Sequence, residues 1–128
     1  MRPRLISKEN AKVIADAGGV IGAWTHLAGS VDEYAGNIRA LVDVVGVDHV
    51  GIRTDTKLAK PAGAGGGRGR GPGGDRTNQA WPDLNGGFYN GVAAALRKQG
   101  FTPDEVGKIG GGNFCRVFDA VTTVSTPD

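Results

Sequence analysis

The residue of this chain best placed for acid–base chemistry is Asp55, which ends an apolar run that begins at Val50. Such a run, bounded by turn residues, predicts a buried strand. In parallel α/β architectures the carboxyl ends of the strands face the active site, so an acid there is a candidate for proton transfer. One carboxylate alone makes neither a metal site nor a hydrolase.

Other residue types that carry chemistry are sparse. A single cysteine, Cys115, excludes an internal disulfide framework and any multi-cysteine zinc site. Because Cys115 follows Phe114 in an apolar helix pattern, we expect a small core residue there and not a nucleophile. His26 has no partner at metal-ligand spacing, and His49 lies at the start of its strand, the end away from an active face.

The elements that position Asp55 follow from the first half of the chain. Ser7 predicts the N-cap of a helix over 8–17, with an apolar face formed by Val13, Ile14 and Ala17. The run 19–24 predicts a strand that Trp24 ends, where this side chain either lines a pocket or simply packs.

A second helix follows, because Ser30 and Glu33 form a capping box. The apolar residues beyond it recur every three or four positions and predict a buried stripe of Val31, Ala35, Ile38, Leu41, Val42 and Val45. The next strand spans 49–55, so the order is strand, helix, strand, which favours parallel pairing.

The second half is predicted to be helical after an interruption. The segment 59–78 holds too little apolar surface to order itself, so we expect a flexible Gly/Arg-rich loop. Helices are then predicted over 87–99, from Thr102 to the triple glycine 110–112, and from Asn113 onward with an apolar face of Phe114, Val117, Phe118 and Val121. Asn113 is expected to act as the cap of this last helix.

Two strands against five helical segments leave the edges of a parallel sheet without partners. An ordered set of segments also resembles the C-terminal part of the membrane (renal) dipeptidase family of zinc dipeptidases. The set comprises Arg2-Pro3-Arg4, Gly18-Gly19-Val20-Ile21-Gly22, Gly46-Val47-Asp48-His49-Val50-Gly51-Ile52, Asp55 and Gly111-Gly112-Asn113-Phe114-Cys115-Arg116-Val117-Phe118. The resemblance implies an α/β fold in which residues 1–128 form a partial domain, the last two βα units and C-terminal helices of a (β/α)8 TIM-type barrel.

The resemblance also implies a function, the hydrolysis of dipeptides with two zinc ions. Arg4 matches an arginine of the family that resembles a clamp for the substrate carboxylate, a task that suits a guanidinium fork. Asp55 matches an aspartate at a strand end, which implies a role in proton transfer or in orienting a metal-bound water. The zinc ligands of the family lie upstream of the matching segments, so no metal ligand is assigned and the isolated chain is expected to be inactive.

Two departures from the family pattern surround Asp55. Arg53 replaces a glycine and Lys57 replaces a second aspartate. A cation at position 53 would either repel metal and reshape the pocket or pair with Asp55 and hold it ionised.

Two alternatives to catalysis remain open. The chain is either a non-catalytic remnant or a split-chain subunit, and its open sheet edges then predict a homo-oligomer or a partner that supplies the missing barrel strands. The second alternative is nucleic-acid binding. The tract 67–71 resembles Arg-Gly segments that bind RNA, although it holds only Arg68 and Arg70 and no aromatic residue. A solvated loop is the default expectation for that tract.

Composition narrows the class of protein only broadly. The formal net charge of +2 is too small to indicate nucleic-acid binding by itself. The sequence contains no apolar run of about 18 residues and no basic-then-apolar leader. The localisation of the protein therefore stays open.

Overall fold

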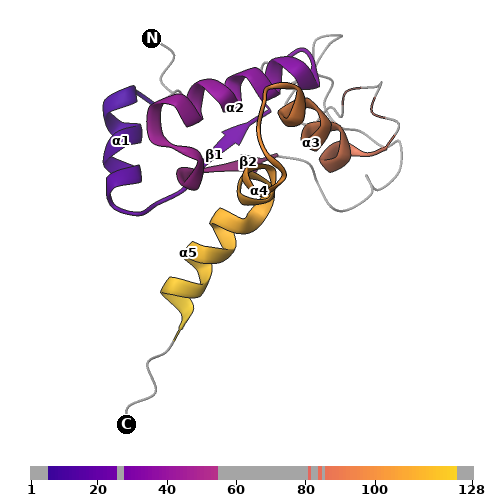
Figure 1. Ribbon diagram of the computed structural model, residues 1–128. Helices are drawn as coiled ribbons and strands as arrows, with labels where there is room; N and C mark the ends of the chain where they lie inside the picture. Colours follow the sequence, from indigo (N-terminus) through magenta and orange to yellow (C-terminus); the bar gives the residue numbers. More distant parts are fainter. Residues whose placement is uncertain (1–5, 26–27, 55–80, 82–83, 85, 124–128) are drawn as a thin grey trace, which may run out of the picture.

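The computed structural model describes residues 6–25, 28–54, 81, 84 and 86–123 (Figure 1). Several of the positions singled out from the sequence lie outside these ranges, and their expected roles are not tested by the structure. These positions are Arg4, His26, Asp55, Lys57, Arg68, Arg70 and the whole segment 59–78.

The described chain is a mixed α/β fold built on two parallel strands. Strand β1 (Ile21–Trp24) pairs with β2 (Val50–Arg53), and the register sets Gly22 opposite Gly51 and Trp24 opposite Arg53. Helix α2 (Val31–Val45) connects the two strands, as the strand, helix, strand order predicted. The mixed α/β class and the parallel pairing are therefore confirmed.

Helix α2 begins with a variant of the predicted capping box. The Ser30 hydroxyl accepts from the Glu33 amide at 3.1 Å, as expected, whereas the Glu33 carboxylate accepts from the Gly29 amide at 2.8 Å. The reciprocal bond thus reaches one residue further back than the box requires. Both bonds satisfy backbone donors that a helix start leaves without intrahelical partners.

One face of α2 covers the strand pair (Figure 1). Ala35 and Ile38 of the predicted stripe are fully buried, and its other members are half-buried against the same core. Tyr34 is also buried and is the largest of the fully buried side chains among the described residues. The hydrophobic stripe is confirmed, with Tyr34 as an addition that the sequence pattern had not included.

Helix α1 (Lys8–Asp16) has the predicted N-cap but a different buried face. The Ser7 hydroxyl accepts from the Asn10 amide at 3.1 Å. Ala11 and Ala15 are the buried residues, while the residues expected inside are exposed: Val13, Ile14 and Ala17. The prediction was wrong because it followed the large apolar side chains, whereas alanines allow the helix backbone to approach its neighbours closely.

The second half contains α3 (Phe88–Lys98), α4 (Pro103–Gly107) and α5 (Asn113–Thr122). The start of α4 is the predicted one, because Thr102 and Glu105 exchange bonds of 2.8 and 3.2 Å in a complete capping box. The triple glycine does not end the helical run outright. A wide turn over Lys108–Gly112 leads straight into α5, and Gly111 leaves the helical conformation to make a kink.

Helix α5 points away from the rest of the described chain, which it meets at its first turn (Figure 1). Phe114 packs on Gly51 of β2, yet 43% of Phe114 stays exposed, and Phe118 and Val121 are more exposed still. Cys115 is exposed as well, so the expectation of a core cysteine was wrong. Of the apolar face predicted for this helix, Val117 is half-buried, and the other members are exposed within the described part of the chain.

Gly51 is predicted to be intolerant of a side chain. A Cβ atom there would lie 2.9 Å from Cδ2 and 3.0 Å from Cζ of Phe114, and closer still to Cε2. We expect Gly51→Ala to lower the free energy of unfolding by about 1–3 kcal/mol, because the ring must move off the strand. Urea denaturation measures this effect.

Two further variants isolate the cause of this loss. In a Phe114→Ala background, Gly51→Ala should cost little, because the overlapping ring is gone. Gly107→Ala is the matched control, since no atom lies within 4 Å of the new Cβ. An equal loss with and without the Phe114 ring would contradict the proposed overlap.

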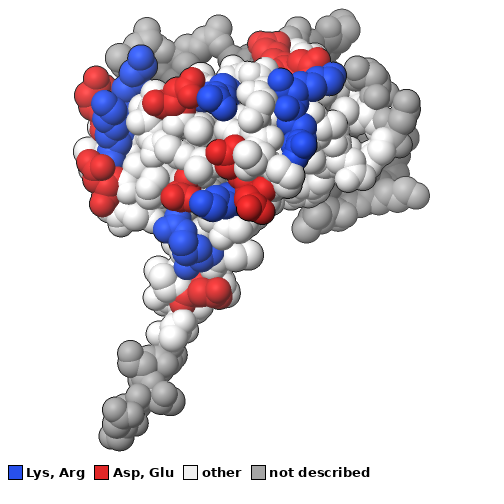
Figure 2. Space-filling view, in the orientation of Figure 1, with Lys and Arg blue, Asp and Glu red and all other residues white. Residues whose placement is uncertain are grey.

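Charged residues of both signs are interspersed over the face shown in Figure 2, with no large area of one sign. None of the described helices is long and apolar enough to span a bilayer. On this face, the distribution of charge does not single out a site for a polyanion.

Candidate functional site

The carboxyl ends of β1 and β2 form one edge, where a parallel sheet presents its functional groups. Side chains alternate between the two faces of each strand. Ala23 and Ile52 belong to the core under α2. Trp24 and Arg53, the last residues of the paired strands, therefore share the opposite face.

Arg53 crosses from its own strand to the neighbouring one on that face. A Cβ atom at Gly22 would lie 3.0 Å from Cβ and 3.5 Å from Cδ of Arg53, so the aliphatic part of the arginine rests on the glycine. The guanidinium carbon ends 5.6 Å from the centre of the Trp24 ring. This cation–π contact fixes where the positive charge lies at the edge.

Tyr34 reaches the same edge from the α2 side. Its buried hydroxyl donates to the Ala23 carbonyl at 2.6 Å. Burial raises the pKa of Tyr34 to about 12, and a backbone hydrogen bond from Arg53 opposes this rise in part. At neutral pH the phenol is therefore protonated, and its hydrogen bond to Ala23 holds α2 against the end of β1.

An aromatic cluster surrounds Tyr34. Trp81 and Phe88 stack at 5.8 Å between ring centroids, and Trp81 lies 5.6 Å from the Tyr34 ring. The Trp81 indole donates to the Ala28 carbonyl at 3.1 Å, which fastens the chain just after β1 to the chain that returns toward α3. Through its burial and this hydrogen bond, Trp81 anchors the returning segment.

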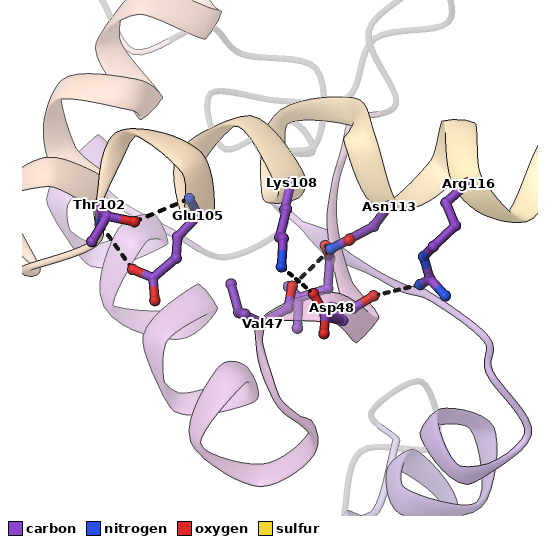
Figure 3. A network of polar contacts seen from close by, with 8 residues as sticks. Val47, Asp48, Thr102, Glu105, Lys108, Asn113 and Arg116 are labelled. Carbon is purple, nitrogen blue, oxygen red and sulfur yellow. Dashed lines mark hydrogen bonds and ion pairs between the residues drawn. The ribbon is translucent and has the colours of Figure 1, made fainter.

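The opposite, amino-terminal edge of β2 is held by Asn113 (Figure 3). Its amide nitrogen donates to the carbonyl of Val47 at 2.7 Å and to that of Val50 at 2.8 Å. The Asn113 side chain is buried and does not cap α5, so the predicted role was wrong. Its two hydrogen bonds instead join the last helix to the start of the strand, and the conformation of the preceding glycines allows this approach.

A charged pair reinforces this edge (Figure 3). Lys108 lies 2.7 Å from the Asp48 carboxylate, and Arg116 donates to the Asp48 carbonyl at 2.7 Å. The hydrogen bond from Lys108 holds the pKa of Asp48 below its ordinary value, so this contact is lost as the pH falls through that lowered pKa. Both side chains of the ion pair are about half exposed, and its contribution to stability is small.

His49 lies at this amino-terminal edge, as expected from the sequence. Its Nδ1 donates to the Gly19 carbonyl at 2.9 Å, so the histidine ties the turn before β2 to the chain before β1. The position is far from the carboxyl edge along a strand of four residues. The role of His49 shown by the structure is structural.

The residues predicted from the sequence to do chemistry, Arg4 and Asp55, lie outside the described ranges, so the structure does not bring them together or separate them. Sequence reasoning missed the pairing of Trp24 with Arg53. A signal for it was present: both strands read apolar, Gly, apolar and then a large side chain, and aligning these patterns gives the observed register.

No known protein or family was found that resembles this chain closely enough to identify it: comparisons with protein-family models, with curated proteins and with solved structures give no match. Among the described residues, no three His, Cys, Asp or Glu side chains gather in a way that could hold a metal ion. The site is therefore defined by its own geometry, a cation and an aromatic ring above the ends of two parallel strands.

Proposed function

We propose that this chain forms the last two βα units of a (β/α)8 barrel of the membrane dipeptidase type and takes part in the hydrolysis of dipeptides. The observation that carries the proposal is the strand pair itself: β1 and β2 are parallel, in register and joined by a helix on one face. This is the unit from which such barrels are built. The ordered segments that resemble the family support the same assignment.

In this proposal Asp55 handles a proton at the carboxyl edge. Asp55 would take a proton from the attacking water and return it to the leaving amine, and Arg4 would hold the free carboxylate of the dipeptide.

Zinc, when bound to a complete enzyme of this type, supplies the activation of water. The described residues do not fit a zinc site, since no group of ligands is present among them. We assign to this chain the roles of proton transfer and substrate binding, because the family resemblance puts the zinc ligands upstream of the matching segments. Other strands of the barrel would have to hold the ions.

Dipeptidase assays in zinc-containing buffer test the proposal. The pure chain is expected to hydrolyse none of a panel of dipeptides. Mixed with the zinc-binding part of a membrane dipeptidase, truncated before the segment that matches Arg4, it should form a complex that hydrolyses dipeptides. The truncated enzyme alone is the control. Failure to associate would overturn the barrel assignment, and turnover by the pure chain would contradict the expectation that it is inactive alone.

A non-catalytic assembly subunit is a second candidate function. The observation that favours it is the exposed apolar surface of α5, where Phe118 and Val121 are 66% and 75% exposed. Surface of this kind commonly marks contact with another chain. Sedimentation tests the second candidate, because a subunit of this kind should self-associate or bind a partner. A monomer that also unfolds cooperatively would count against it.

A further inference from the structure

Three exposed apolar side chains on α5 form a stripe with the spacing of a helix–helix contact. Phe114, Phe118 and Val121 are separated by four and then three residues, so they lie along one side of a helix that turns by about 100° per residue. Their exposed fractions are 43%, 66% and 75%. This spacing is typical of a seam that packs against one other helix, and we call the three residues the α5 seam.

No charged residue of α5 lies within this seam. Cys115 and Thr122 flank it on one side, and the half-buried Val117 flanks it on the other. Arg116 and Asp119, the two charged residues of the helix, lie on its other side, where Arg116 binds the backbone before β2. When two copies of one chain pair about a two-fold axis, each charge at the centre of the contact meets an equal charge. The α5 seam avoids this repulsion.

The direction of α5 leaves room for a second copy. Beyond the kink at Gly111 the helix points away from the rest of the described chain (Figure 1). In an antiparallel pair of such helices, the folded parts of the two copies lie at opposite ends of the pair. A lipid surface fits α5 less well, because helices that lie on membranes carry several Lys or Arg on their polar face, and α5 has one arginine and one aspartate.

We propose that the α5 seam is a self-association surface, on which two copies of this chain pair through antiparallel α5 helices. The three side chains expose about 300 Å² per copy, on the basis of about 200 Å² for a whole phenylalanine. The pair then buries about 600 Å², roughly half of what the smaller stable complexes bury. We therefore expect a reversible dimer with a Kd on the order of 10⁻⁴ M. The inference goes beyond the proposed function, because the pairing requires neither zinc nor barrel strands.

A concentration series of the whole chain tests the pairing. In sedimentation velocity between about 20 μM and about 1 mM, the average mass should rise from that of a monomer toward that of a dimer. In ¹⁵N NMR spectra over the same range, the amide signals of α5 should shift with concentration. Those of β1 should stay in place, because β1 lies outside the proposed contact.

Two variants assign the pairing to the seam. Phe118→Glu places a carboxylate at the centre of the contact in both copies and should weaken the dimer by more than about 10-fold. Val13→Glu is the matched control, since Val13 on α1 is 67% exposed and Phe118 is 66% exposed. This variant should form the dimer as the wild-type chain does. Circular dichroism should show both variants folded, because both replaced side chains are on the surface.

The inference would be overturned by a wild-type chain that stays monomeric up to about 1 mM, or by a dimer that survives Phe118→Glu. An equal loss of pairing in the Val13 variant would also overturn it, because the association would then be non-specific. If phosphatidylglycerol vesicles shift the α5 signals of a monomeric chain, the partner is a lipid surface and the proposed dimer is wrong. Failure of the dipeptidase assays would leave these results unchanged, since sedimentation does not depend on turnover.

Discussion

Replacing Asp55 by asparagine is expected to lower the kcat of dipeptide hydrolysis by the reassembled barrel by about 10²–10⁴-fold, the usual contribution of a general acid–base group. Asparagine keeps the size of the side chain but cannot accept a proton from water. The effect should fall on kcat more than on KM, because the proposed role of Asp55 lies in the chemical step. Steady-state kinetics of the variant complex measure the two constants.

Asp48 supplies the matched control for this experiment. It lies just before β2, at the amino-terminal edge, and its carboxylate is bound to Lys108. Asp48→Asn should leave kcat within about 2-fold of the wild-type value, while removing the small pH-dependent stability of that ion pair. If both variants lose activity equally, the loss reflects assembly of the barrel and the catalytic assignment of Asp55 fails.

Asn113→Asp is expected to lower the free energy of unfolding by about 3–5 kcal/mol at neutral pH, because it buries a carboxylate without a donor. Asparagine donates to two carbonyl oxygens, those of Val47 and Val50. An aspartate of the same shape presents oxygen to both and donates to neither. Denaturant unfolding at neutral pH measures the loss. The helical ellipticity of the chain should also fall, because α5 loses its attachment to β2.

Asn90→Asp is the control for this substitution. The Asn90 amide also donates to a carbonyl, that of Gly86 at 2.7 Å, but on the exposed surface of the chain. Water can replace that bond, so we expect a change below about 1 kcal/mol. Similar losses at the two positions would show that the two buried hydrogen bonds of Asn113 have no special role.

Local signals predicted the elements of the fold well. Ser7, Ser30 and Thr102 each begin a helix as predicted and accept from the backbone amide three residues later, because a helix start is decided within four residues. The face of α1 could not be predicted, since the choice between alanines and larger apolar residues depends on how closely its neighbours approach. The same holds for α5, whose predicted apolar face is largely exposed in the part of the chain that the structure describes.

The candidate site was harder to predict than the fold. Asp55 could be singled out because a strand end is visible in one short run of sequence. The contact of Arg53 with Trp24 joins two strands, so it depends on their register, which becomes visible only when the patterns of the two strands are aligned with each other. Asn113 was read as a cap because its position fits one, whereas its real partners lie more than sixty residues earlier.

That separation in sequence has a consequence for the order in which the chain folds during synthesis. Ribosomes deliver β1, α2 and β2 well before Asn113, which binds Val50 across 63 positions. Until α5 emerges, the carbonyls that Asn113 will bind can only be hydrated, and closing so long a loop is slow. During much of synthesis the strand pair therefore lacks the two hydrogen bonds that Asn113 makes at the start of β2. A chaperone could bind this state, which ends when the last helix docks.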